Sequence, residues 1–180
     1  MVYRFKIISE EAENFCREIE ISPDMEFIAL RDAILDSVGY SKDEINTFYI
    51  CDDDWRRHDE VAIEDFGSNS DTDLYLMDQT AIYELVQDEG QHIEFIYDGL
   101  TERSFFLELK EIITGRTLDK PVCTVKTGKA PAQHVDIDEF EESIKKKADD
   151  LSRELDIDFY GDTDFDEEEL GDGFDDLEIS

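Results

Sequence analysis

The side chains that could act as nucleophiles are few and widely spaced in this chain. Its three cysteines form no Cys-x-x-Cys pair, and each of its three histidines stands alone. A thiolate site needs a neighbouring base, so it would require Cys51 to meet His58 or His92 in the fold. A free cysteine is more often a buried, unreactive residue, and the sequence favours that interpretation of Cys51.

Phosphate and cofactor chemistry has no support in the sequence. The chain has no Walker or dinucleotide-binding glycine pattern, and its charge is wrong for a phosphate cradle. Carboxylates are so numerous that a general acid–base pair always exists on paper, but only burial separates the pKa values of two such groups. We therefore expect no cofactor. The sequence leaves enzymatic activity open and favours its absence.

One acidic run has the spacing of a calcium-binding loop. Carboxylates stand at positions 1, 3, 9 and 12 of a twelve-residue EF-hand pattern, and Gly161 stands at position 6. Position 5 is Tyr160, which has no carboxylate, and no exit helix is predicted after the run. We expect a solvated acidic run, with specific calcium binding as the alternative. In that alternative, the calcium ligands would be Asp156, Asp158, Asp164 and Glu167.

Trp55 is the only tryptophan and stands between three aspartates and two arginines. An aromatic side chain flanked by both signs of charge can anchor a partner. Alternatively, its ring packs the surrounding loop onto the core. The sequence leaves both open, so Trp55 is a candidate binding residue.

The charge of the chain restricts its partners more than its chemistry. The sequence has 50 acidic residues against 17 Lys and Arg, a formal net charge of −33. Residues 136–180 contain 20 acids and 4 bases, or −16, which leaves −17 on the rest. Such a surface repels nucleic acid and anionic lipid and attracts basic proteins. We expect neither nucleic acid nor a membrane as partner.

The elements that would position these residues begin with two strands and a helix. Polar and apolar residues alternate over 3–7 and 15–21, which predicts a β-hairpin. Apolar residues then recur every three or four positions over 27–38, and Gly39 follows where a helix commonly ends. A third strand is predicted at 47–51, and the acidic run over 52–73 predicts a long irregular excursion.

Further strands complete the predicted fold. Residues 80–87 fit a short helix and an extended segment equally well. Residues 92–97 and 104–113 predict a second hairpin, and 122–125 predicts a last short strand. We expect a single α+β domain over 1–133, with one amphipathic helix packed on a mostly antiparallel or mixed sheet and a β-grasp-like ββαβ start.

The period of the apolar residues changes after Asp136. They then form one stripe at helical spacing, which predicts an amphipathic helix over 134–155. The stripe would bury against the protein's own sheet, a partner or a second copy. Residues 156–180 have too little apolar area to offset chain entropy and are predicted to be a disordered acidic tail. The stripe consists of Ile137, Phe140, Ile144, Ala148, Leu151 and Leu155.

Several segments resemble a known family in the same order. The runs LRDAI, GY and TFY, all between residues 30 and 49, are similar to a helix and strand of the family named after the third open reading frame of plasmid pRiA4b. The run FIYDG at 95–99 resembles the strand and turn of that family. The likeness covers about residues 3–133. Its closing proline-rich segment is matched by Cys123, Gly128, Ala130 and Pro131.

The chain also departs from the family pattern. Arg31 stands where the family usually has a histidine, Leu100 replaces a second aspartate, and Arg103 stands near an expected tryptophan. The resemblance implies a fold and a bacterial origin, and the family's biochemical role is uncharacterised. If the family has a site at this strand and turn, Tyr97, Asp98 and Arg103 are its candidate binding residues here.

Three functions are compatible with these observations. We favour a non-catalytic acidic protein that engages a basic protein partner. The alternative is an enzyme or small-molecule site near Trp55, Tyr97 and Asp98, which a deep pocket lined by these residues would support. A further alternative is a DNA mimic. Because the chain has no signal-peptide pattern and no long apolar run, we expect a cytoplasmic protein, and its oligomeric state is left open.

Overall fold

The computed structural model describes residues 1–67 and 73–154 of the chain. The chain divides into two compact units, Met1–His134 and Val135–Ser180, and each is considered by itself. The predicted acidic tail at 156–180 lies outside the described residues. The same holds for the calcium ligands predicted there, Asp156, Asp158, Asp164 and Glu167.

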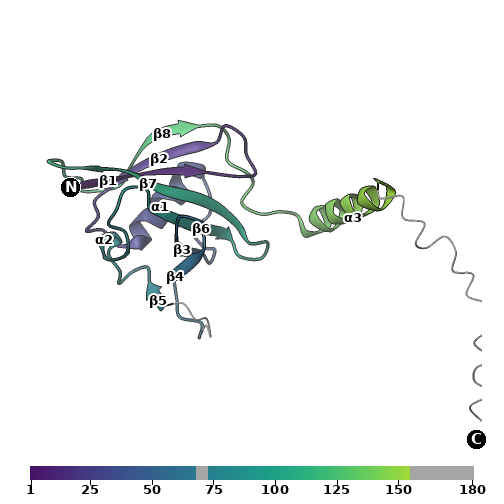
Figure 1. Ribbon diagram of the computed structural model, residues 1–180, viewed down its shortest axis with the longest axis horizontal. Coiled ribbons are helices and arrows are strands. Elements are labelled where there is room, and N and C mark those ends of the chain that lie inside the picture. The colour runs from purple at the N-terminus through teal and green to yellow at the C-terminus, as the bar shows by residue number, and fades with distance from the viewer. Residues whose placement is uncertain (68–72, 155–180) are drawn as a thin grey trace, which may run out of the picture. The chain divides into compact units, whose positions relative to one another are not determined.

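A mixed sheet of eight strands forms the centre of the first unit among its described residues (Figure 1). The strand order is β5-β4-β3-β6-β7-β1-β2-β8, and all neighbours are antiparallel except β4 and β5. Both predicted hairpins are confirmed, since β1 pairs with β2 and β6 with β7. The strands are β1 (Val2–Ile8), β2 (Cys16–Ile21), β3 (Thr47–Cys51), β4 (Arg57–Ala62), β5 (Asp73–Leu76), β6 (His92–Asp98), β7 (Arg103–Ile113) and β8 (Val122–Thr127).

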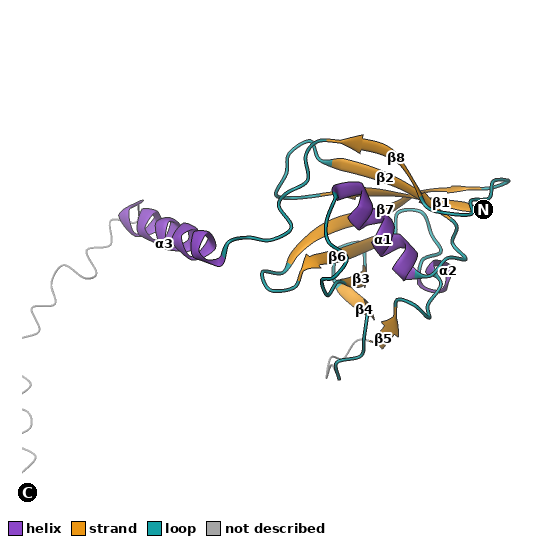
Figure 2. Ribbon diagram, turned by 180° about the vertical axis from the view of Figure 1, so that it is seen from behind, coloured by secondary structure: helices purple, strands orange, loops and turns teal. Residues whose placement is uncertain are grey.

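Helix α1 (Phe27–Val38) packs on one face of this sheet, as the spacing of its apolar residues predicts (Figure 2). Phe27, Leu30 and Ile34 are fully buried in the core. The helix ends at Gly39, whose φ of 73° is a left-handed conformation that glycine adopts at little cost. The first unit is therefore an α+β domain.

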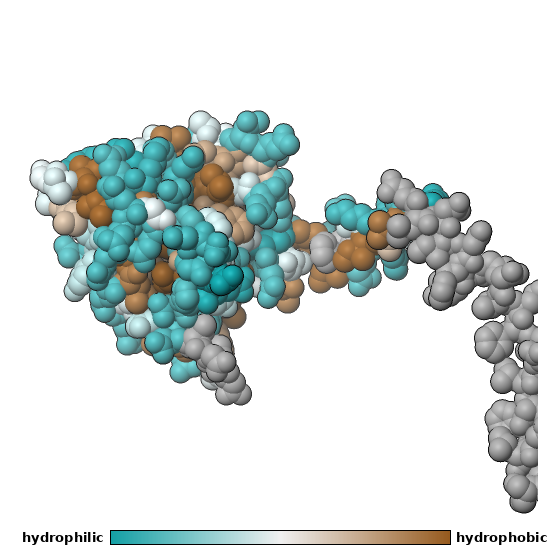
Figure 3. Space-filling view, in the orientation of Figure 1, coloured by the Kyte–Doolittle hydropathy of each residue, from teal (hydrophilic) through white to brown (hydrophobic). Residues whose placement is uncertain are grey.

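Alternation along the strands separates the two faces of the sheet. Phe5, Phe95 and Phe105 are fully buried in the same core as α1. The opposite face contains ion pairs between strands, such as Arg57 of β4 with Glu94 of β6 at 2.8 Å, across the intervening β3. Figure 3 shows a mainly hydrophilic surface with small, separate hydrophobic patches.

The prediction of an irregular excursion over 52–73 is wrong in part. The segment contains β4, which pairs with β3, and it ends where β5 begins. Only Val61 and Ala62 of β4 are buried, so the apolar alternation is too short to be recognised in the sequence. The segment 80–87 contains the short helix α2 (Ile82–Leu85).

The second unit contains α3 (Ile137–Glu154), where a helix was predicted from the apolar stripe. Its Ile137, Ile144 and Leu151 side chains are exposed. One helix cannot bury its own stripe, so what covers this stripe stays a prediction. Within the described part of the chain, no helix is long and apolar enough to cross a membrane.

Candidate binding sites on the first unit

The turn between β6 and β7 brings three of the predicted site residues together. Tyr97 and Asp98 end β6, and Arg103 begins β7. The Arg103 Nη1 atom lies 3.9 Å from Asp98 Oδ2, and the guanidinium carbon lies 5.2 Å from the centre of the Tyr97 ring. We call these three residues, with Tyr40 and Glu11 that contact them, the turn cluster.

The Asp98 carboxylate is occupied by the turn itself. Its Oδ1 atom accepts a hydrogen bond from the Leu100 backbone at 3.1 Å, and its Oδ2 atom accepts one from the Thr101 hydroxyl at 2.6 Å. An aspartate that bonds residues two and three positions ahead stabilises a tight turn. Asp98 therefore shapes the connection between β6 and β7.

The guanidinium of Arg103 ties the turn to two distant segments. Its Nε and Nη2 atoms donate to the Glu11 carboxylate at 2.8 and 2.6 Å, and Nη1 donates to the Ala132 carbonyl at 2.8 Å. The hydrogen bond to Glu11 raises the pKa of Arg103 further above its ordinary value. A forked arginine bond to a carboxylate is directional, so Arg103 holds the three segments in a defined arrangement.

Two tyrosines lie side by side in this cluster, with ring centres 5.3 Å apart. The hydroxyl of Tyr40 donates to the Pro131 carbonyl. The hydroxyl of Tyr97 is fully buried, and no hydrogen-bond partner for it is found among the described residues. Burial raises the pKa of Tyr97 and raises the pKa of Tyr40 to about 12. Both phenols therefore stay protonated near neutral pH and can only serve as neutral hydrogen-bonding groups.

The segment 128–133, which follows β8, covers the turn cluster and is held by side-chain bonds to its backbone. Arg17 donates to the Gly128 carbonyl at 3.2 Å, and Tyr40 and Arg103 bond the carbonyls of Pro131 and Ala132. Gly128 has a φ of 68°, and a Cβ there would lie 2.8 Å from the Phe15 Cα atom. Gly128 and Pro131, two of the residues on which the family resemblance was based, thus help to close this end of the sheet.

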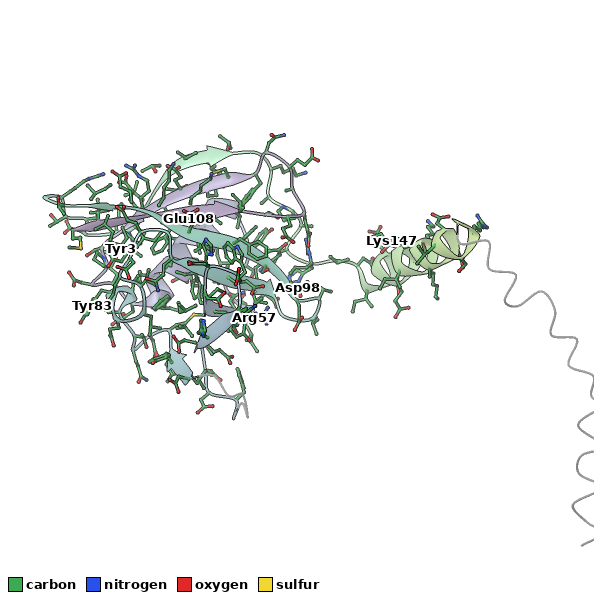
Figure 4. The ribbon with its side chains drawn as sticks, in the orientation of Figure 1. Tyr3, Arg57, Tyr83, Asp98, Glu108 and Lys147 are labelled. Atoms are coloured by element: carbon green, nitrogen blue, oxygen red, sulfur yellow. The ribbon has the colours of Figure 1, made fainter. Side chains whose placement is uncertain are left out.

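Trp55 lies at a different place from the turn cluster. Its ring stacks on His92 with centres 4.1 Å apart and an angle of 1° between the planes, and it meets the edge of Phe106 at 5.0 Å. His92 is the first residue of β6 and Asp98 the last, which separates them by about 20 Å along the strand. Figure 4 shows Asp98 and Glu108 at different places on the sheet, and Glu108 lines the same hollow as Trp55. The single site predicted near Trp55, Tyr97 and Asp98 is therefore divided in two.

The hollow beside Trp55 is small. It has a volume of about 60 Å³, room for a few water molecules, and its lining includes Lys6, Ile8, Phe106 and Glu108. Trp55 has a φ of 62°, which is rare for a bulky residue. Its stacking on His92 and its T-shaped contact with Phe106 pack the loop onto the sheet.

Cys51 and His92 stand opposite each other on β3 and β6. The thiol is nevertheless buried and bonds the Tyr49 carbonyl at 3.5 Å. Burial raises the pKa of Cys51 to about 11, whereas a nucleophilic cysteine needs a lowered pKa. Cys51 therefore has the properties of a structural thiol, although it stands opposite a histidine in the sheet.

A larger hollow beside the 41–46 loop was not predicted from the sequence. It has a volume of about 350 Å³, and we call it the acidic hollow. Ile45 and Phe66 line it with exposed fractions of 60% and 66%. The available signal was the apolar residues Ile45, Ile63 and Phe66 within acidic stretches of the chain. Its other lining residues are Arg31, Lys42, Asp43, Glu44, Ile63 and Glu64.

A second hollow, of about 430 Å³, lies along β5. Its apolar lining comes from Leu74, Tyr75 and Leu76, which are only partly exposed. Its remaining lining residues are polar or acidic: Asp65, Gln79, Thr80 and Glu84. This hollow lacks the strongly exposed apolar side chains of the acidic hollow.

Comparison with known proteins finds one matching family and a solved structure of similar fold. The model of the plasmid pRiA4b ORF-3-like protein family matches residues 1–172. This extends the resemblance, which was based on residues 3–133, through α3. A crystal structure of a protein of unknown function, MM3350 from Methanosarcina mazei Go1, is similar with a TM-score of 0.58 and 15% identity, covering 90% of each chain. At that identity the likeness shows the fold alone. No curated protein matches.

Proposed function

The chain belongs to the plasmid pRiA4b ORF-3-like protein family, and we propose that it is a non-catalytic binding protein whose acidic surface engages a basic protein partner. Membership of a family does not by itself assign an activity. The support for the proposal therefore comes from the charges and contacts of this chain.

The observation that carries the proposal is the uncompensated acidic charge of the first unit. Residues 1–135 have a net charge of −17 without the C-terminal part. Many of their bases are already paired with carboxylates of the same unit, so they offer little positive surface to a partner. These bases are Arg4, Arg31, Lys42, Arg57, Arg103, Lys110 and Arg116.

The state of the reactive groups supports a non-catalytic role. The thiol of Cys51 is buried with a pKa of about 11, and the phenols of Tyr40 and Tyr97 have raised pKa values. Arg103 and Asp98 bond to segments of the unit itself. Groups that already serve the fold are poorly placed for proton transfer or nucleophilic attack.

One observation favours the small-molecule alternative. The buried Tyr97 hydroxyl has no partner in the described part of the chain, and such groups usually have one. The neighbouring Tyr40 and Arg103 are, however, bonded to the carbonyls of Pro131 and Ala132. The DNA-mimic alternative would need rigid carboxylates at phosphate spacing, and it has no comparable support.

Two finer expectations belong to the proposal as well. We describe the start of the chain as β-grasp-like, on the basis of its strand, strand, helix, strand order. We also place the protein in the cytoplasm as part of the same proposal.

Affinity purification tests the proposed function. Immobilised full-length protein is exposed to lysate of its native host and eluted with rising salt. We expect the retained proteins to be more basic than the lysate average, to elute between about 0.1 and 0.5 M salt, and to bind again when purified. A retained set of average charge would contradict the proposal. So would salt-sensitive binding of purified DNA in a gel-shift assay.

A further inference from the structure

Three apolar side chains line the acidic hollow, and we call them its apolar floor. Ile45 and Phe66 are 60% and 66% exposed, and the partly buried Ile63 also lines the hollow. Large apolar side chains that gather at one exposed hollow are typical of an interaction site. Its volume of about 350 Å³ is within the range of natural ligand sites.

The loop that carries Ile45 is fixed by a buried arginine. Arg31 of α1 donates from Nε to the Asn46 Oδ1 atom at 2.8 Å and from Nη2 to the Glu44 carbonyl at 3.1 Å. Asn46 is itself fully buried and donates to the Tyr97 carbonyl at 3.3 Å. Ile45 thus lies between a backbone carbonyl and a side chain that both bond to buried groups, and these bonds fix the loop around it before any partner arrives. Preorganisation of this kind lowers the entropic cost of binding.

The rim of the hollow is acidic, because its two bases are engaged elsewhere. Lys42 pairs with Asp36 at 2.9 Å, and Arg31 pairs with Asp32 at 2.9 Å. The carboxylates of Asp43, Glu44 and Glu64 line the same hollow. Within reach of this rim, His134 lies 3.5 Å from Glu44, and it is charged only when protonated.

We infer that the acidic hollow is the docking site for an amphipathic basic helix of the partner protein, an inference that rests on the proposed function. Apolar residues on one face of such a helix would pack on Ile45 and Phe66, and flanking Lys or Arg would lie against Asp43, Glu44 and Glu64. The acidic rim argues against nucleic acid and anionic lipid as occupants. The apolar floor distinguishes the hollow from the merely charged parts of the surface.

A pair of synthetic peptides tests the inference with the full-length chain. The first is an eighteen-residue Leu/Lys helix whose leucines form one face. The second has the same composition in an order that disperses the leucines around the helix. By fluorescence anisotropy at about 150 mM salt, we expect the first peptide to bind about tenfold more tightly than the second, because only the first presents an apolar face.

Variants of exposed residues locate the binding. Ile45→Ser and Phe66→Ser should each weaken the first peptide by about tenfold and leave the second unchanged. Leu100→Ser is the matched control, because Leu100 is 89% exposed on the β6–β7 turn and does not line the hollow. Glu44→Gln with Glu64→Gln should weaken both peptides and reduce their salt dependence. A photoreactive leucine on the first peptide should cross-link to the hollow.

Three results would overturn the inference. If Phe66→Ser and Leu100→Ser have the same effect, the hollow is not the site, although a basic partner can still bind the acidic surface. If both peptides bind equally, charge alone explains their binding. If Phe66→Ser instead converts a dimer into a monomer in analytical ultracentrifugation, a second copy occupies the hollow. Failure of the proposed function would appear separately, as retained proteins of average charge in the affinity experiment.

Discussion

The turn cluster and the acidic hollow use similar residue types in opposite ways. In the turn cluster, Tyr40 and Arg103 bond to distant segments and Asp98 bonds within its own turn, so that end of the sheet is closed. In the acidic hollow, Arg31 also forms hydrogen bonds inside the fold, but these bonds fix the loop that carries the exposed Ile45. The turn residues that the sequence analysis named as candidate binding residues therefore maintain the structure. The surface best suited to recognition contains residues that look ordinary.

The largest expected effect is a difference in unfolding free energy between a substitution in the buried core and one in the acidic hollow. Leu30→Ala should lower the free energy of unfolding by about 2–5 kcal/mol, because Leu30 is fully buried between α1 and the sheet. Ile45→Ala is the matched control at an exposed site, and it should cost less than about 0.5 kcal/mol. Urea unfolding followed by circular dichroism measures both. Equal costs would show that Ile45 is part of the core.

The next effect tests how the segment 128–133 closes the turn cluster. Gly128→Ala should cost about 2–4 kcal/mol, because the new methyl group would collide with the backbone of Asn14 and Phe15 at a left-handed φ. Gly115→Ala shares the left-handed φ, at 74°, but has open space around it. It should cost only about 1–2 kcal/mol. Similar losses of unfolding free energy in the two variants would mean that the segment does not pack tightly on Phe15.

Alkaline pH should weaken the turn cluster selectively. Burial raises the pKa of Tyr40 from 10.0 to about 12, so the folded protein keeps a proton that the unfolded chain loses. This contribution to stability is complete below pH 10 and is lost as the pH rises through 12. Tyr40→Phe should flatten the decline of unfolding free energy over this range. Tyr83→Phe, at an exposed position, is the control, and an unchanged slope in Tyr40→Phe would contradict the assignment.

The smallest expected effect concerns the buried hydroxyl of Tyr97. Tyr97→Phe removes a buried group that has no partner in the described residues, so stability should stay within about 1 kcal/mol of the original or rise. Thermal unfolding of the two proteins checks this. A loss well above 1 kcal/mol would show that the hydroxyl bonds a water or ligand, and it would reopen the small-molecule alternative at the turn cluster.

Local patterns predicted much of the framework. The spacing of Leu30 and Ile34, the glycine at 39 and the alternation in β1, β2, β6 and β7 each follow from periods that a few consecutive residues display. β4 was missed because an inner pair of residues, Val61 and Ala62, is all that it buries. The family resemblance also followed from short runs of residues, and the family model that matches residues 1–172 confirms it.

The candidate sites were only partly predictable. Tyr97, Asp98 and Arg103 do meet, because a hairpin joins them across a short turn. Trp55 does not join them, because its ring stacks on the first residue of β6, at the other end of the strand. The acidic hollow combines Ile45 with Phe66, and nothing in the intervening sequence indicates that these two residues approach each other.

The sequence by itself determined the acidic charge, the positions of most strands and helices and the membership of the family, since these depend on composition or on neighbours along the chain. Tertiary structure alone decided which side chains meet, whether Cys51 and Tyr97 are accessible, and where apolar residues stay exposed. The physical reason is that burial and long-range hydrogen bonds, such as those from Arg103 to Glu11 and Ala132, arise only when distant segments pack. Those contacts fix which groups are bonded within the fold and which stay exposed.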